Sequence, residues 1–246
     1  MPFTFSHPAI VLPLALLPRQ WLSLTGLVIG SITPASEYFL RMKVRSDYSH
    51  TINGLFWFDL PAGLLLAFLF HIFVKDSLFD NLPQILQSRL TLYKQFKWTI
   101  YFKANWPIVL VSIMIGAASH LLWDSFTHEH GYFVSALPPL AEPVNLYGVQ
   151  LPTFKILQHS STLIGSIIIA AAMYKLPADR KANHSLYIGY WIILATITFL
   201  IVAFRVLGGL DIKMYGHLIA TTIAGLILSM IIAPVFVRKI TGGNKV

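Results

Sequence analysis

The chain has 246 residues, of which 56% are hydrophobic and 11% are charged, and its mean hydropathy is +0.67. This composition excludes soluble folds and indicates an integral membrane protein. The formal net charge of +8 does not require a nucleic-acid partner if the basic residues follow the membrane topology, and the absence of cysteine excludes disulfides and thiolate sites.

The start of the chain predicts a hairpin of two short helices. Pro8, Pro13 and Pro18 interrupt the first apolar run. The second run, Trp21 to Ile32, has about 12 residues and is too short to cross a hydrocarbon core of roughly 30 Å. We therefore expect residues 1–53 to form a re-entrant hairpin, which enters and leaves the membrane on one side, and an outer loop.

Five later apolar runs are each about 20 residues long, the length that a helix needs to cross a bilayer. The predicted fold is therefore an all-α bundle of about five spanning helices, in a single membrane-embedded domain over residues 1–246. Residues 54–176 would supply the helices of a candidate site, and residues 186–237 two further spanning helices. The five runs are Gly54 to Val74, Trp106 to Phe126, Ile156 to Leu176, Leu186 to Leu207 and Gly216 to Val237.

The basic residues predict the orientation. If the hairpin returns to its own side, Arg19, the loops 75–105 and 175–185 and the tail all lie on one side, which is the more basic one. The positive-inside rule places that side in the cytoplasm, although the cluster Arg41 to Arg45 then falls outside. The basic and aromatic residues of 81–105 are expected to lie along the inner headgroups.

Most of the metal-capable side chains fall at the outer ends of the predicted elements, while the inner halves carry almost nothing ionisable. Ionisable groups in membrane helices are costly, and they are functional hypotheses by default. The candidate site residues in this outer group are His7, Glu37, His50, Asp59, His120, Asp124, His128 and His159.

The stretch "ASHLLWDSFTHEHG", residues 117–130, carries the clearest pattern in this group. His120 and Asp124 are four residues apart, which places them one turn apart on the same helix face, where both can reach one ion. Imidazole and carboxylate ligands suit zinc, or manganese or iron if water fills more positions. The alternative interpretation is a cluster of interfacial polar residues without an ion.

Three of the outer residues have structural alternatives. Asp59 precedes Pro61 by two residues, so its alternative role is to cap a helix that starts at Leu60. His128 follows the predicted helix and is solvated in the alternative interpretation. His159 lies near the start of the next helix, and its alternative role is to form hydrogen bonds with serine or backbone groups there. In the functional interpretation, these three side chains support the ligands or contact a substrate.

Several stretches resemble a family of bacterial membrane proteins of unknown function, the domain of unknown function 4184. That family in turn resembles the inner-membrane metal-dependent hydrolases and, more distantly, the zinc-dependent phospholipases C. The resemblance implies a bacterial inner-membrane protein whose metal ligands are His7, an acidic residue around 35–37, His50, His120 and Asp124. The stretches are "MPFTFSHPAIVLPL", "GLVIGSITPASEYF", "YSHTINGLFWFDLPAGLLL", "ASHLLWDSFTHEHG" and "KILQHSSTLIG".

One position departs from the family pattern. An aspartate usually follows the proline of this turn, whereas here Pro34 is followed by Ala35. Glu37 is then the nearby carboxylate, and its longer side chain is expected to substitute for the aspartate. The other expectation is that the site binds fewer ions than those of relatives.

We therefore expect a membrane-bound metal-dependent hydrolase of phosphoesters at the outer membrane–water interface. The expected cofactor is a divalent metal, with zinc first, and the expected partners are the lipid bilayer and a lipid or other phosphoester substrate. Asp124, Asp59 or Glu37 would orient or deprotonate the attacking water. The alternatives are a non-catalytic membrane protein with a degenerate metal site and a transporter of metal or a small solute. The sequence does not define the oligomeric state.

The predicted orientation can be tested in this cysteine-free chain by adding single cysteines. We expect Ser135→Cys, but not Ser88→Cys, to react with a membrane-impermeant thiol reagent added to intact cells. The opposite labelling pattern would reverse the topology.

Overall fold

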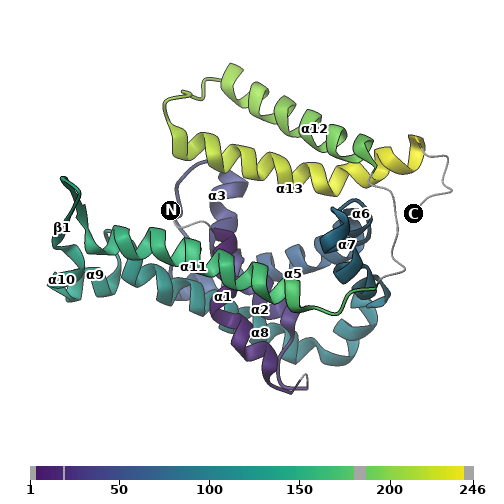
Figure 1. Ribbon diagram of the computed structural model, residues 1–246, viewed down its shortest axis with the longest axis horizontal. Helices are drawn as coiled ribbons and strands as arrows, with labels where there is room; N and C mark the ends of the chain where they lie inside the picture. The colour runs from purple at the N-terminus through teal and green to yellow at the C-terminus, as the bar shows by residue number, and fades with distance from the viewer. Residues whose placement is uncertain (1–3, 19, 180–186, 241–246) are drawn as a thin grey trace. The chain divides into compact units, whose positions relative to one another are not determined.

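The computed structural model describes residues 4–18, 20–179 and 187–240, with the side chains of the last helix described up to Val237 (Figure 1). Some residues used to predict the orientation lie outside the described residues, and so does the start of one predicted span. These residues are Arg19, residues 180–185 of the second basic loop, Leu186 and the tail from 241.

The predicted pair of short N-terminal helices is confirmed, while their re-entrant path in the membrane stays a prediction. The first arm is a helical segment, Thr4–Leu16, which includes α1 (Pro8–Val11). The second arm begins with α2 (Leu24–Ile32), where the Ser23 side chain accepts a hydrogen bond from the Gly26 amide and so caps the helix. α1 packs against α2. A 3₁₀ turn, Thr33–Ala35, leads on to α3 (Ser36–Arg41).

Five helical segments are long and apolar enough to cross a membrane, which confirms the predicted all-α membrane fold. Each contains or overlaps one of the apolar runs, because run length and hydropathy are what a bilayer selects. The segments are Ile52–Asp80, Trp98–Ala136, Thr153–Lys175 (α11), Ile188–Leu207 (α12) and Tyr215–Val237, which lies within α13 (Tyr215–Ile240).

The first two segments are irregular. The first comprises α4 (Ile52–Gly54), a π-helical turn Leu55–Asp59, α5 (Leu60–Leu69), a second π-helical turn Phe70–Val74 and α6 (Lys75–Asp80). The second comprises α8 (Trp98–Thr127) and α9 (Tyr132–Ala136). α8 is kinked at Asn105, two residues before Pro107, whose ring prevents regular helical bonding in the preceding turn.

The connection between these segments is more helical than the sequence indicates. α7 (Gln84–Leu90) and a 3₁₀ turn, Thr91–Gln95, precede α8. The buried ammonium of Lys75 donates to the carbonyls of Lys94 and Phe96, both at 3.0 Å, and so fixes the end of this connection against α6. Its predicted position along the headgroups stays a prediction.

A small β-hairpin, which the sequence analysis did not predict, lies between α9 and α11. α10 (Pro138–Ala141) leads into β1 (Pro143–Leu146), which pairs antiparallel with β2 (Val149–Pro152). Tyr147 and Gly148 connect the strands with φ of 51° and 87°, the positive values that a tight two-residue turn requires.

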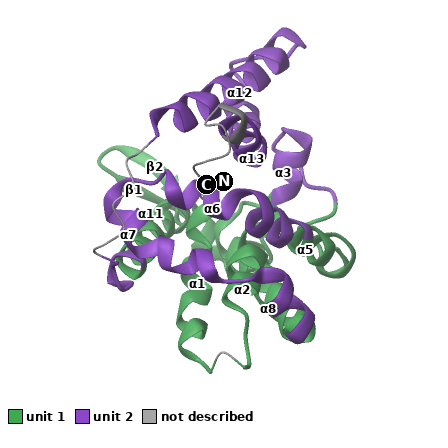
Figure 2. Ribbon diagram, turned by 90° about the vertical axis from the view of Figure 1, so that its right-hand side faces the viewer, with its two compact units in different colours: residues 1–35, 48–64, 105–172 green, residues 36–47, 65–104, 173–246 purple. Residues whose placement is uncertain are grey.

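The chain divides into two compact units (Figure 2). The first comprises residues 1–35, 48–64 and 105–172, and the second comprises residues 36–47, 65–104 and 173–246. In the second unit, α12 and α13 pack along each other around Tyr190, Leu194 and Ala233. The expectation of a single domain stays a prediction.

Within the first unit, α2 and α8 approach each other at backbone distance. A Cβ on Gly30 would overlap the carbonyl of Ile113, and a Cβ on Gly116 would overlap the carbonyl of Leu27. Such close packing of glycine faces is a common way for helices to associate in membranes. The Ser23 amide also donates to the Ser112 hydroxyl at 2.8 Å, which ties the start of α2 to α8.

We predict that Gly30→Ala lowers the stability of the detergent-purified protein by about 1–3 kcal/mol, because the added methyl group forces α2 away from α8. The midpoint of thermal unfolding measures this loss. Ala118→Leu is the matched control, since it adds volume at an exposed position of α8. Equal melting of Gly30→Ala and wild type would show that the close contact is not required.

Candidate metal centre

Near the end of α8, a histidine and an aspartate are both buried. His120 and Asp124 are 2% and 8% exposed, and they lie four residues apart on the same helix face. The spacing therefore does place an imidazole beside a carboxylate, as the sequence predicts. The C-terminal end of the helix adds partial negative charge, which favours a cation at this place.

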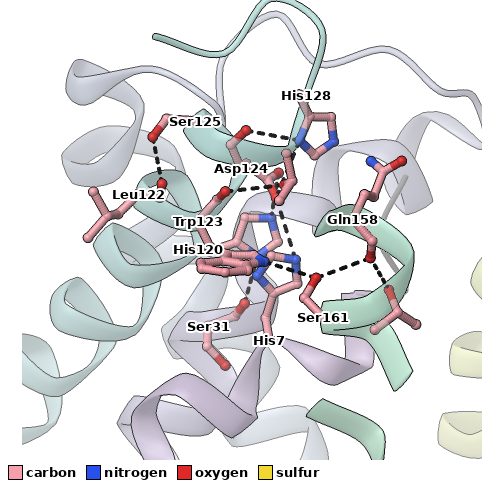
Figure 3. Close-up of polar contacts among 12 residues, drawn as sticks. His7, Ser31, His120, Leu122, Trp123, Asp124, Ser125, His128, Gln158 and Ser161 are labelled. Carbon is pink, nitrogen blue, oxygen red and sulfur yellow. Dashed lines mark hydrogen bonds and ion pairs between the residues drawn. The ribbon is translucent and has the colours of Figure 1, made fainter. Parts of the chain in front are cut away.

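Four imidazoles surround the carboxylate of Asp124 (Figure 3 labels three of them). His7, in the turn before α1, and His128, just beyond α8, lie 3.6 Å and 3.5 Å from Oδ1 through Nε2 and Nδ1 respectively. His50 and His120 lie 3.4 Å and 3.3 Å from Oδ2, both through Nε2. Three segments that are distant in the sequence therefore meet at one carboxylate.

These separations are typical of metal ligands. Hydrogen bonds between a charged N–H and a carboxylate are about 2.7–2.9 Å long, shorter than any of the four. Around a tetrahedral zinc ion with bonds of about 2.0–2.1 Å, neighbouring ligand atoms are about 3.3 Å apart. Ligand atoms of His7, His120 and Asp124 all lie within 4.8 Å of one another. The three side chains therefore fit a single divalent cation.

The orientation of His120 also fits a metal ligand. Its Nδ1 lies 2.7 Å from the backbone carbonyl of Ser31 on α2. Because a carbonyl oxygen can only accept, Nδ1 carries the hydrogen and donates it. In the neutral ring, Nε2 then has a free lone pair on the side of Asp124, as in metal-bound histidines whose other nitrogen donates to a carbonyl.

His7 is held in its neutral form. Its ring stacks on that of His120, with centroids 3.8 Å apart and an angle of 15° between the planes. Burial lowers the pKa of His7, which lies outside the five spanning segments, to about 3, and His120 adds to this effect. A neutral imidazole keeps a lone pair for a ligand role.

Nδ1 of His7 and Oδ1 of Asp124 are buried and have no hydrogen-bond partner in the described part of the chain. A buried polar atom left without a partner costs about 1–3 kcal/mol. A cation held by Asp124 would offset the cost at Oδ1, so the residues present fit a metal.

The cluster is more accessible on one side. The side chains of His50 and His128 are 22% and 33% exposed, against 2% for His7 and 3% for His120. Nδ1 of His128 lies 3.2 Å from the backbone carbonyl of Asp124 and donates to it, so this nitrogen is not free to bind an ion. His128 therefore flanks the site, while Nε2 of His50 remains a candidate ligand.

Glu37 has other partners. It belongs to the second unit, and its carboxylate accepts hydrogen bonds from Arg41 Nε at 2.8 Å and from the Asp47 amide at 3.0 Å. The group of three residues that fits a cation does not include it. Its role as a ligand in place of the aspartate missing at Ala35 stays a prediction.

Asp59 does not cap a helix that starts at Leu60, because helical structure runs from Ile52 through the π-helical turn and onwards. The side chain is fully buried in the first unit. Its turn packs against Thr33–Ala35, the segment that follows Ser31. Asp59 is therefore a second buried carboxylate, on a turn that contacts the segment after Ser31, and its catalytic role stays a prediction.

On α11, the buried residue is the neighbour of the predicted one. His159 is exposed, whereas Gln158 is buried and lies beside the cluster in Figure 3. The Trp123 indole donates to the Ser161 hydroxyl at 3.2 Å, which joins α8 to α11. The sequence analysis missed Gln158 and Ser161, although their spacing of three puts them on one helix face. It also missed the Ser31 carbonyl, for which no side-chain pattern exists.

Comparison with known proteins gives a family but no assigned function. A family model described as domain of unknown function (DUF4184) matches residues 1–235. No curated protein and no solved structure matches the chain. The family match includes every residue of the cluster, and it confirms the resemblance to that family, whereas the further resemblance to metal-dependent hydrolases stays a prediction.

We predict that the detergent-purified wild type binds zinc or manganese in near-stoichiometric amount and that His120→Ala and Asp124→Asn lose it, because each removes a ligand. Elemental mass spectrometry measures the metal content. His159→Ala should retain the metal, since this histidine is exposed on α11. Wild type that stays empty after metal is offered would contradict the assignment.

Proposed function

The chain belongs to the family described as domain of unknown function (DUF4184), and we propose that it is a membrane-bound metal-dependent hydrolase of phosphoesters. The observation that carries this proposal is the convergence of imidazoles on one buried carboxylate, at separations that suit ligands of one cation. The donor set favours zinc, with manganese or iron as alternatives.

In this proposal, different residues bind the metal, accept the proton of the water and contact the substrate. His7, His120 and Asp124 hold the ion, and His50 completes the set from the accessible side. A bound divalent metal would lower the pKa of a water molecule towards about 7 and polarise the ester oxygen. Asp59 is the buried carboxylate that we assign to accept the proton of that water. His128 flanks the open side and contacts the substrate.

The surroundings of His50 support a substrate in or near the membrane. Trp57 and Tyr48 are 55% and 45% exposed, and their rings meet edge to face with centroids 5.0 Å apart. Aromatic side chains of this kind concentrate at membrane–water interfaces. A phosphoester at headgroup depth would therefore approach the more exposed side of the cluster. With the predicted topology, this is the outer face of a bacterial inner membrane.

The test is metal-dependent hydrolysis by the purified protein with zinc or manganese. The substrates are a water-soluble aryl phosphate, phosphatidic acid and phosphatidylglycerol, each presented with and without the metal. We expect turnover of at least one phosphoester that requires the metal. Metal-loaded wild type without turnover on any of them would contradict the proposal.

Asp59→Asn separates catalysis from metal binding. We predict that this variant keeps its metal but loses about 10²–10⁴-fold in kcat, the usual contribution of a general base. Asp211→Asn is the control, because Asp211 is exposed in the second unit and should leave kcat unchanged. Full activity of Asp59→Asn would exclude Asp59 as the base.

A further inference from the structure

The β-hairpin before α11 has one entirely apolar face. In its register, Val144 pairs with Leu151 and Leu146 pairs with Val149. Paired residues share a face of a two-stranded sheet, and so do residues two apart along a strand. These four side chains therefore form one face, which we call the apolar face. The opposite face carries Asn145 and Gln150 between Pro143 and Pro152.

The apolar face is largely uncovered by the residues that the structure describes. Val144, Leu146 and Val149 are 41%, 39% and 57% exposed, and Tyr147 projects fully from the tip. An isolated two-stranded hairpin is only marginally stable in water. Contiguous exposed apolar surface of this kind marks a contact with another phase or molecule.

The position of the hairpin indicates the occupant. It joins two membrane-spanning segments, since one span ends at Ala136 and α11 begins at Thr153, directly after β2 (Figure 1). The amide and hydroxyl of Thr153 both donate to the Glu142 carbonyl, at 3.0 Å and 3.1 Å, which closes the base of the hairpin on the start of α11. The hairpin is therefore fixed to the start of a candidate membrane-spanning helix.

The composition of this connection also favours lipid. Residues 131–153 contain a single charged residue, Glu142, and no basic one. The exposed apolar surface continues from the hairpin to Leu137 and Tyr132, which are 46% and 74% exposed. Without basic residues, this connection is not attracted electrostatically to anionic lipids. It can interact with the bilayer by burying its apolar surface and by placing its aromatic side chains at headgroup depth.

We propose that the apolar face of this β-hairpin lies in the interface of the bilayer, between the headgroups and the acyl chains. The hairpin then fixes the depth of the adjoining ends of α8 and α11, and with them the depth of the histidine cluster. This inference does not rest on the proposed function, since the depth of the hairpin is the same whether or not the protein is a hydrolase.

The test uses single nitroxide labels, which the cysteine-free chain allows without background. Val149→Cys places a label on the apolar face, and Gln150→Cys places its control on the opposite face; both positions are exposed. Each labelled protein is reconstituted into phosphatidylcholine vesicles. Power-saturation spectroscopy then compares collisions with oxygen, which concentrates in the bilayer, with those of a water-soluble nickel chelate.

We expect the ratio of oxygen to nickel collisions to be several-fold higher at 149 than at 150. Leu146→Cys and Asn145→Cys form a second pair with the same expectation, which covers the failure of one variant to fold. If the ratio of oxygen to nickel collisions is equally low at both positions of each pair, the hairpin lies in water and the proposal is overturned. Low collision rates with both agents at 149 and 146 would also overturn it, because the face would then be covered by protein, such as a second copy of the chain.

Discussion

The candidate centre depends on the backbone contact between α2 and α8. Gly30 precedes Ser31, whose carbonyl receives the Nδ1 hydrogen of His120 at 2.7 Å. Gly116 lies four residues before His120, so the helix face that allows close approach also carries the histidine. A larger residue at either glycine would move the carbonyl away and leave the His120 ring without its orientation. Packing between the two helices therefore determines which nitrogen of His120 carries the hydrogen and which one can bind an ion.

Electrostatics gives the reason why this arrangement points to a cation. An ionised carboxylate is expensive to bury unless a positive charge or hydrogen bonds compensate it. Asp124 is 8% exposed, and its nearest imidazole nitrogens are at distances longer than charged hydrogen bonds. The low pKa of His7 disfavours a proton on that ring as the compensating charge. A divalent ion would compensate the carboxylate while using the lone pairs of the imidazoles.

The sequence predicts the parts of this account that depend on spacing and length. His120 and Asp124 follow from helical periodicity, and the spans follow from apolar runs, since the bilayer imposes one length on all of them. For Glu37, the sequence predicts a ligand role from its place in the chain, and the structure adds Arg41 as an ion-pair partner one turn later; the ligand role itself stays a prediction. The Ser31 carbonyl and the β-hairpin depend on tertiary packing and on four-residue strands, for which local sequence carries little signal.

The most direct test of the metal centre is X-ray absorption at the metal edge of the protein loaded with one equivalent of zinc. The account predicts nitrogen and oxygen ligands at about 2.0–2.1 Å, with the outer-shell scattering of at least two imidazoles. A shell of light atoms without imidazole scattering would mean that the ion is bound elsewhere. The four histidines around Asp124 would then be a polar cluster at a helix end, and the metal centre would be contradicted.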